Sequence, residues 1–118
     1  MPSQVRRHPD FLADLEAQVL WLDRNRDARW ILRLREAVYE ATRALARFPN
    51  MGAPVALGDP RDAAAEPLRK LILRGVPFIV WYAIAGDDVW LLRLFHARQE
   101  RPHPRRRAAG LPRPVVTR

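Results

Sequence analysis

The sequence predicts an α+β fold in which an N-terminal helical hairpin packs on a small, mainly antiparallel C-terminal β-sheet. Two observations lead to this fold class. Apolar residues recur at helical spacing through the first 48 residues, and three short segments rich in β-branched and aromatic residues follow residue 67. The length of 118 residues supports one domain with a real hydrophobic core and leaves little room for a second.

Two amphipathic helices are expected in the first half of the chain. Pro9 suits the first turn of a helix, and apolar residues recur three and four positions apart across Phe11–Leu22. The same spacing continues more regularly across Ile31–Phe48, where Pro49 ends the pattern. The polar segment Asp23–Asp27 separates the two patterns, so we expect an antiparallel helical hairpin.

Consecutive antiparallel strands are expected over Leu68–Leu73, Phe78–Ala85 and Val89–Phe95, because glycine-containing turns separate them. The last two are apolar at nearly every position, which is typical of strands covered on both faces. The helical hairpin covers one face, and a loop, another subunit or a partner chain is expected on the other. Ser3–Arg7 is interpreted as a short edge strand, and Asn50–Pro67 as a long loop.

Composition excludes several classes of protein. The chain has no cysteine, which excludes disulfides, thiolate metal sites and a cysteine nucleophile. No run of about 18 apolar residues is present, so no membrane span is expected, and the N-terminus lacks the apolar stretch of a secretory signal. A cytoplasmic location is therefore expected. The three histidines are far apart in sequence, and we expect neither a metal nor a cofactor.

The net charge of +8 is concentrated at the C-terminus. Residues 1–96 hold 14 basic and 12 acidic side chains, whereas residues 97–118 hold seven arginines and one glutamate. Four prolines and few large apolar residues in that segment predict a flexible basic tail. We therefore divide the chain into a domain at 1–101 and a tail at 102–118. The charge indicates an anionic partner, either nucleic acid or an acidic protein segment.

A group of polar side chains on or beside the expected strands forms the candidate site: Arg69, Arg74, Tyr82, Arg93, His96 and Arg98. Arginine binds phosphate oxygens through its fork, and histidine titrates near neutral pH, so the pair suits cleavage of a phosphodiester. His96 and Arg98 share one face of an extended strand. The alternative is a set of surface ion pairs with a hydrogen-bonded structural histidine. Tyr82 is expected in the core, and the four tryptophans in the core or facing a partner.

Five sequence motifs resemble the RelE/ParE superfamily of toxins from bacterial type II toxin–antitoxin systems, which includes plasmid stabilisation proteins. They are Asp14-Leu15 in the first helix, the helix exit Leu45–Gly52, and the strand segments Leu68–Leu71, Ile79–Tyr82 and Leu92–Arg98. Their order and spacing agree with the helix–helix–sheet pattern. The resemblance covers about residues 4–101.

The resemblance implies a growth-inhibiting toxin that is neutralised by a co-expressed antitoxin and forms a hetero-oligomer with it. In this superfamily the C-terminal segment of the antitoxin wraps around the helices and sheet of the toxin. Acidic antitoxin side chains would then meet the arginines of this chain.

The resemblance also implies two alternative activities. RelE-like members cut mRNA on the ribosome, and here Arg69, His96 and Arg98 would be the catalytic residues. ParE-like members inhibit DNA gyrase by binding and are not nucleases. Lys70 is the only lysine and no C-terminal tyrosine is present, which favours the ParE-like activity. A third possibility is a non-toxic member whose basic tail tethers it to nucleic acid.

Overall fold

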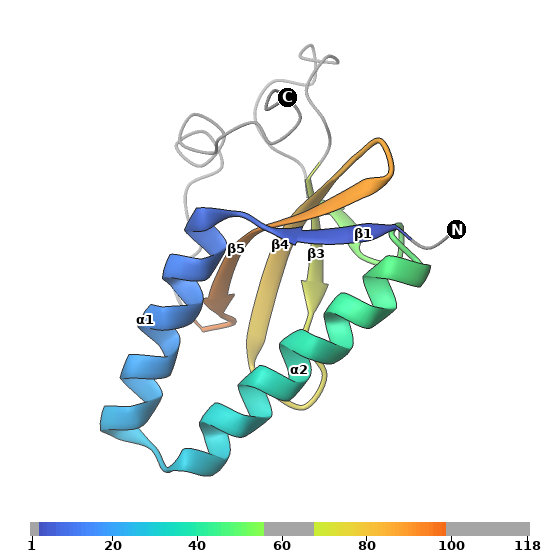
Figure 1. Cartoon of the computed structure of the whole chain (residues 1–118). Helices are drawn as coiled ribbons and strands as arrows, with labels where there is room; N and C mark the ends of the chain where they lie inside the picture. Colours follow the sequence, from blue (N-terminus) through green and yellow to red (C-terminus); the bar gives the residue numbers. More distant parts are fainter. Residues whose placement is uncertain (1–2, 56–67, 99–118) are drawn as a thin grey trace.

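The computed structural model describes residues 3–55 and 68–98, which form two helices and one five-stranded sheet (Figure 1). The predicted basic tail, 102–118, lies outside the described residues. In chain order the elements are β1 (Gln4–Arg7), α1 (Pro9–Asn25), α2 (Ala28–Arg47), β2 (Ala53–Val55), β3 (Leu68–Ile72), β4 (Phe78–Ala85) and β5 (Asp88–His96).

Side-chain caps determine where the two helices begin. Nδ1 of His8 accepts a hydrogen bond from the backbone N–H of Asp10 at 3.0 Å, and Asp27 accepts one from Arg29 at 3.0 Å. The break that the sequence predicts at Asp23–Asp27 is shorter in the structure, because α1 continues to Asn25. The predicted helical hairpin is confirmed.

The sheet has the strand order β1-β5-β4-β3-β2. Strands β3, β4 and β5 are antiparallel neighbours, as predicted. The expected edge strand is present as β1, and it runs parallel to β5, with Val5 opposite Val89. The helical hairpin connects β1 at one edge of the sheet to β2 at the other edge.

The prediction of a loop throughout Asn50–Pro67 is wrong at Ala53–Val55, which forms β2. This three-residue strand pairs only with β3 at the edge of the sheet. Pro54 is compatible with that position because an edge strand has one side on which no backbone donor is needed. A strand so short, with a proline in its middle, has no detectable sequence pattern.

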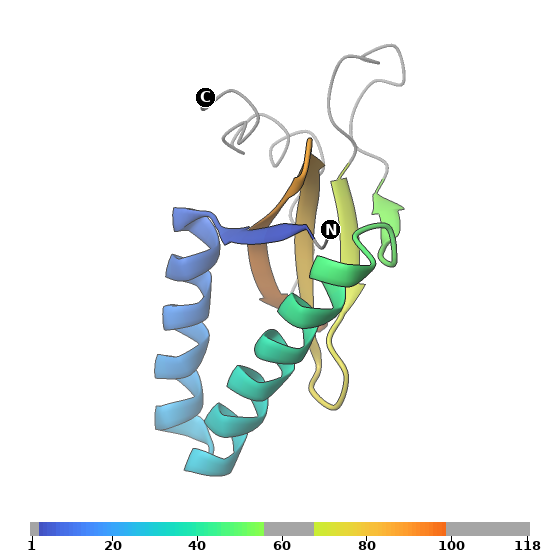
Figure 2. The same cartoon turned by 45° about the vertical axis from the view of Figure 1, so that its right-hand side comes forward.

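Both faces of the central strands are buried. On one face, Val80, Tyr82 and Leu94 pack with Phe11 and Leu34 of the helices, which lie together on that side of the sheet (Figure 2). The residues buried on the opposite face are Leu68, Ile79, Trp81, Ala83, Leu92 and Phe95. Alternate side chains of β4 thus enter different clusters, which explains why the strand is apolar at nearly every position.

Candidate functional site

Arg69 and Tyr82 are direct neighbours on β3 and β4, and both hold the loop that leaves α2. The Tyr82 hydroxyl donates to the carbonyl of Pro49 at 2.8 Å and accepts from the N–H of Gly52 at 2.8 Å. Arg69 Nη1 donates to the carbonyls of Gly52 at 2.7 Å and Asn50 at 3.2 Å. Together they fix the loop of residues 49–52 against the sheet.

Tyr82 is fully buried, as the sequence predicted for a core residue. Burial raises the pKa of its hydroxyl, against the opposing effects of the Gly52 hydrogen bond and the Arg69 charge. The hydroxyl therefore stays protonated at neutral pH and acts as a structural donor and acceptor.

His96 and Arg98 meet at the end of β5. The N–H of Arg98 donates to Nδ1 of His96 at 2.9 Å, and the imidazole packs edge-on against Phe78 with ring centroids 5.2 Å apart. Partial burial lowers the pKa of His96, and the charges of Arg98 and Arg26 lower it further. The imidazole is therefore neutral at pH 7, and it carries its proton on Nε2 because Nδ1 accepts from the N–H of Arg98.

The third predicted residue of the nuclease set lies elsewhere. Arg69 on β3 is opposite Tyr82 of β4, whereas His96 on β5 is opposite Phe78 of β4. The two residues therefore lie on strands at opposite sides of β4, at positions four residues apart along it. Strand rise and spacing separate the Cα atoms of Arg69 and His96 by roughly 16 Å. The fold brings His96 and Arg98 together. It also brings the charge of Arg26, which the sequence pattern did not single out, within reach of His96. Arg69 instead holds the 49–52 loop.

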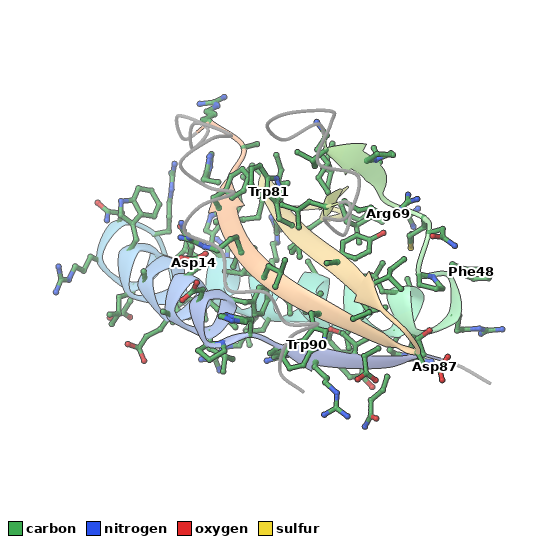
Figure 3. The ribbon with its side chains drawn as sticks, turned by 90° about the horizontal axis from the view of Figure 1, so that it is seen from above. Asp14, Phe48, Arg69, Trp81, Asp87 and Trp90 are labelled. Carbon is green, nitrogen blue, oxygen red and sulfur yellow. The ribbon has the colours of Figure 1, made fainter. Side chains whose placement is uncertain are left out.

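Arg93, another member of the candidate group, forms an ion pair that joins α1 to β5. Its guanidinium donates to both carboxylate oxygens of Asp14, at 2.6 and 3.0 Å, and Asp14 also accepts from the N–H of Leu94 at 2.9 Å. Asp14 lies on the opposite side of the molecule from Arg69 and Phe48 (Figure 3). The interpretation of Arg93 as an ion-paired strand residue is therefore confirmed.

The tryptophans divide between the two predicted roles. Trp81 is buried, Trp30 and Trp90 are half-buried, and Trp21 is 48% exposed.

Within residues 3–55 and 68–98, no three histidine or acidic side chains gather as metal ligands. Neither helix in this part of the chain is long and apolar enough to cross a membrane.

Comparison with known families shows to which family this chain belongs. Residues 5–101 match the family model described as the ParE toxin of the type II toxin–antitoxin system parDE. The chain belongs to the ParE toxin family. The match spans the helical hairpin, the sheet and the Arg69, His96 and Arg98 positions, so the resemblance drawn from the five motifs is confirmed.

A solved structure shares the ParE fold with this chain. It is described as a chromosomal ParDE TA system from P. aeruginosa, and the similarity has a TM-score of 0.63 at 20% sequence identity. The alignment covers 81% of this chain and 97% of the other. The comparison with curated proteins gave no significant match.

Proposed function

We propose that this chain is the toxin subunit of a type II toxin–antitoxin module, that a ParD-type antitoxin binds and neutralises it, and that it inhibits growth by binding DNA gyrase. The observation that carries the proposal is the ParE family match, which covers nearly all of the described residues. The geometry of Arg69 supports inhibition by binding, because its guanidinium donates to loop carbonyls and its Cα atom lies roughly 16 Å from that of His96.

The surface of the helices supports an obligate protein partner. Five of their large apolar side chains are exposed: Leu12, Leu20, Trp21, Leu32 and Tyr39. Leu32 and Tyr39 are seven residues apart and therefore share one face of α2, and exposed apolar patches mark interaction sites. An antitoxin that covers them would gain hydrophobic free energy from each.

One observation favours the alternative activity, a RelE-like ribosome-dependent endoribonuclease. His96 has a lowered pKa and lies beside Arg98 and Arg26. Arg98 and Arg26, whose charges act on this imidazole, can bind a phosphate, and the imidazole can take a proton from a ribose hydroxyl once Nδ1 is released from the N–H of Arg98.

Induced expression separates the two functions. We expect that inducing this chain alone stops growth and that DNA synthesis falls before protein synthesis, while co-expression of its ParD-type antitoxin, sought as a short reading frame that overlaps or abuts the gene, restores growth. The doubly substituted chain His96→Gln, Arg98→Gln should remain toxic, because inhibition by binding needs no group that transfers a proton. Protein synthesis that stops first, together with loss of toxicity in the double variant, would support the nuclease instead.

A further inference from the structure

The end of β5 lies beside the second half of α1 (Figure 1, Figure 2). The N–H of His8, just before α1, donates to the carbonyl of Leu91 at 2.9 Å, and Asp14 accepts from the N–H of Leu94 at 2.9 Å. The helix and the strand therefore run in the same direction. Trp21 is seven residues after Asp14 and shares its face of α1, so it lies toward the end of β5.

The indole of Trp21 is 48% exposed, although it is the largest side chain on α1. Seven residues of helix place it roughly 10 Å beyond Asp14. From Leu94, β5 rises roughly 7 Å to His96, and the N–H of Arg98 then donates to that imidazole at 2.9 Å. An exposed aromatic ring, a histidine and an arginine therefore lie at the same end of the molecule.

Two more guanidinium groups lie where the two helices meet. Cζ of Arg26 is 5.9 Å from the ring centroid of Trp30, and Cζ of Arg33 is 5.4 Å from the same centroid. Trp30 is half-buried and packs against the main core, so it fixes the place of both arginines. The charge of Arg26 also reaches His96, which joins the pair to the end of β5. Together with Trp21 and Arg98, these two arginines form a group that we call the hairpin-end cluster.

The net positive charge of residues 1–96 is located at this end of the molecule. Residues 23–33 hold four basic and two acidic side chains, and the rest of residues 1–96 holds ten of each. One of the two acids, Asp27, is paired with Arg29. None of the three arginines of the hairpin-end cluster forms an ion pair with another described residue. The cluster therefore favours an anionic ligand.

We infer that the hairpin-end cluster binds single-stranded nucleic acid. Its three guanidinium groups contact backbone phosphates, which the arginine fork fits, and the indole of Trp21 stacks on an unpaired base. An acidic peptide would use the cations but would leave the exposed indole without a ring to stack on. The inference goes beyond the proposed function, because it requires neither an antitoxin nor gyrase.

The phosphate contacts are tested by the double variant Arg26→Gln, Arg33→Gln, with Arg43→Gln, Arg47→Gln as the control of equal net charge. The control arginines lie toward the other end of α2, and each is also placed over an aromatic ring. With the full-length chain and an oligothymidylate, we expect the first variant to bind about tenfold more weakly and to lower the slope of log affinity against log salt by about 1.4. The control should change both much less, and equal effects would contradict a role for the cluster.

Stacking is tested by Trp21→Ala and Trp21→Phe. Because Trp21 is exposed, neither substitution removes a core contact. Trp21→Ala should weaken the binding of oligothymidylate about tenfold, whereas Trp21→Phe keeps a ring and most of the affinity. Binding of duplex DNA of the same length should change little, since its bases are already stacked on one another. Parallel titrations with oligothymidylate and oligouridylate distinguish DNA from RNA as the ligand.

Three results would overturn the inference. The first is equal affinity of Trp21→Ala and the wild type for oligothymidylate. The second is polyglutamate that binds as tightly as the oligonucleotide, which would show a general affinity for anions. The third is a chain that binds neither oligonucleotide, and if that chain still inhibits gyrase, the proposed function stands. Binding of an oligonucleotide by a chain without effect on gyrase would instead contradict the proposed function alone.

Discussion

Gly52 has two neighbours that leave no space for a side chain. A Cβ atom at this position would lie 2.6 Å from the carbonyl oxygen of Lys70 and 2.7 Å from two atoms of Tyr82. The close approach is what allows its N–H to reach the Tyr82 hydroxyl. A family motif that ends in this glycine is thereby explained by packing, because any larger residue would displace the 49–52 loop from the sheet.

Removing the Tyr82 hydroxyl should destabilise the protein. Tyr82→Phe leaves the carbonyl of Pro49 and the N–H of Gly52 without their buried partner, at a cost of about 1 to 3 kcal/mol in the free energy of unfolding. Tyr39→Phe is the matched control, since Tyr39 is exposed on α2. Urea unfolding of both variants measures the difference, and equal stabilities would contradict a structural role for the hydroxyl.

His96 should make stability depend on pH. Its pKa in the folded protein is lowered from the ordinary value of 6.5, mainly by burial. The unfolded chain therefore binds a proton more readily, and the contribution of His96 is present above pH 6.5 and lost as the pH falls through the folded-state pKa. We expect the difference in unfolding free energy between the wild type and His96→Gln to decrease from pH 7 to pH 5. A constant difference would contradict this account.

The sequence predicted the residue types of the site but only part of their arrangement. The prediction that His96 and Arg98 share one face of an extended strand is wrong, because β5 ends at His96 and Arg98 lies in the turn that follows. Their contact is the hydrogen bond from the backbone N–H of Arg98 to the imidazole. The contacts of Arg69 depend on the position of the 49–52 loop, which is 17 to 19 residues earlier in the chain. Local spacing holds no information about such long-range pairings, and the same limit applies to the proximity of Arg26 to His96.

At the scale of elements, Asp14 joins α1 to the part of β5 that β1 does not reach. Strand β1 ends opposite Leu91, and the register of β5 against β4 shifts just beyond that point. Beyond the shift, Asp14 of α1 bonds both the guanidinium of Arg93 and the N–H of Leu94. One carboxylate thus satisfies the free edge of β5 in place of a neighbouring strand.

Substitution of Asp14 should reveal this role. Asp14→Ala leaves a half-buried guanidinium and a backbone N–H without an acceptor, and we expect a loss of about 2 to 4 kcal/mol in the free energy of unfolding. Asp14→Asn should cost less, because it keeps one acceptor. Asp27→Asn, at the exposed Asp27–Arg29 pair, should leave stability nearly unchanged. An effect of Asp14→Ala as small as that of the control would contradict the role assigned to Asp14.

The elements themselves were largely predictable. Helix α2 and strands β3 to β5 have strong periodic or apolar patterns, and each lies within a few residues of its expected place. The parallel pairing of β1 and the existence of β2 were not predictable, because both strands are short and their stability comes from neighbours remote in sequence.

At the scale of the whole molecule, two surfaces differ in what they offer a partner. The helices expose large apolar side chains, whereas a groove between α2 and β3 is mostly apolar and has Arg74 and Glu40 in its lining. The sequence predicted an anionic partner from the net charge but located most of that charge in the tail. Sequence order alone could not assemble this groove from α2 and β3.

The proposed function depends most directly on whether this chain inhibits gyrase. The decisive measurement is DNA supercoiling by purified gyrase in the presence of the full-length chain, with and without the proposed ParD-type antitoxin. We predict that the chain inhibits supercoiling and that its antitoxin restores it. Unchanged supercoiling, at concentrations where the chain cuts mRNA on ribosomes, would contradict the account.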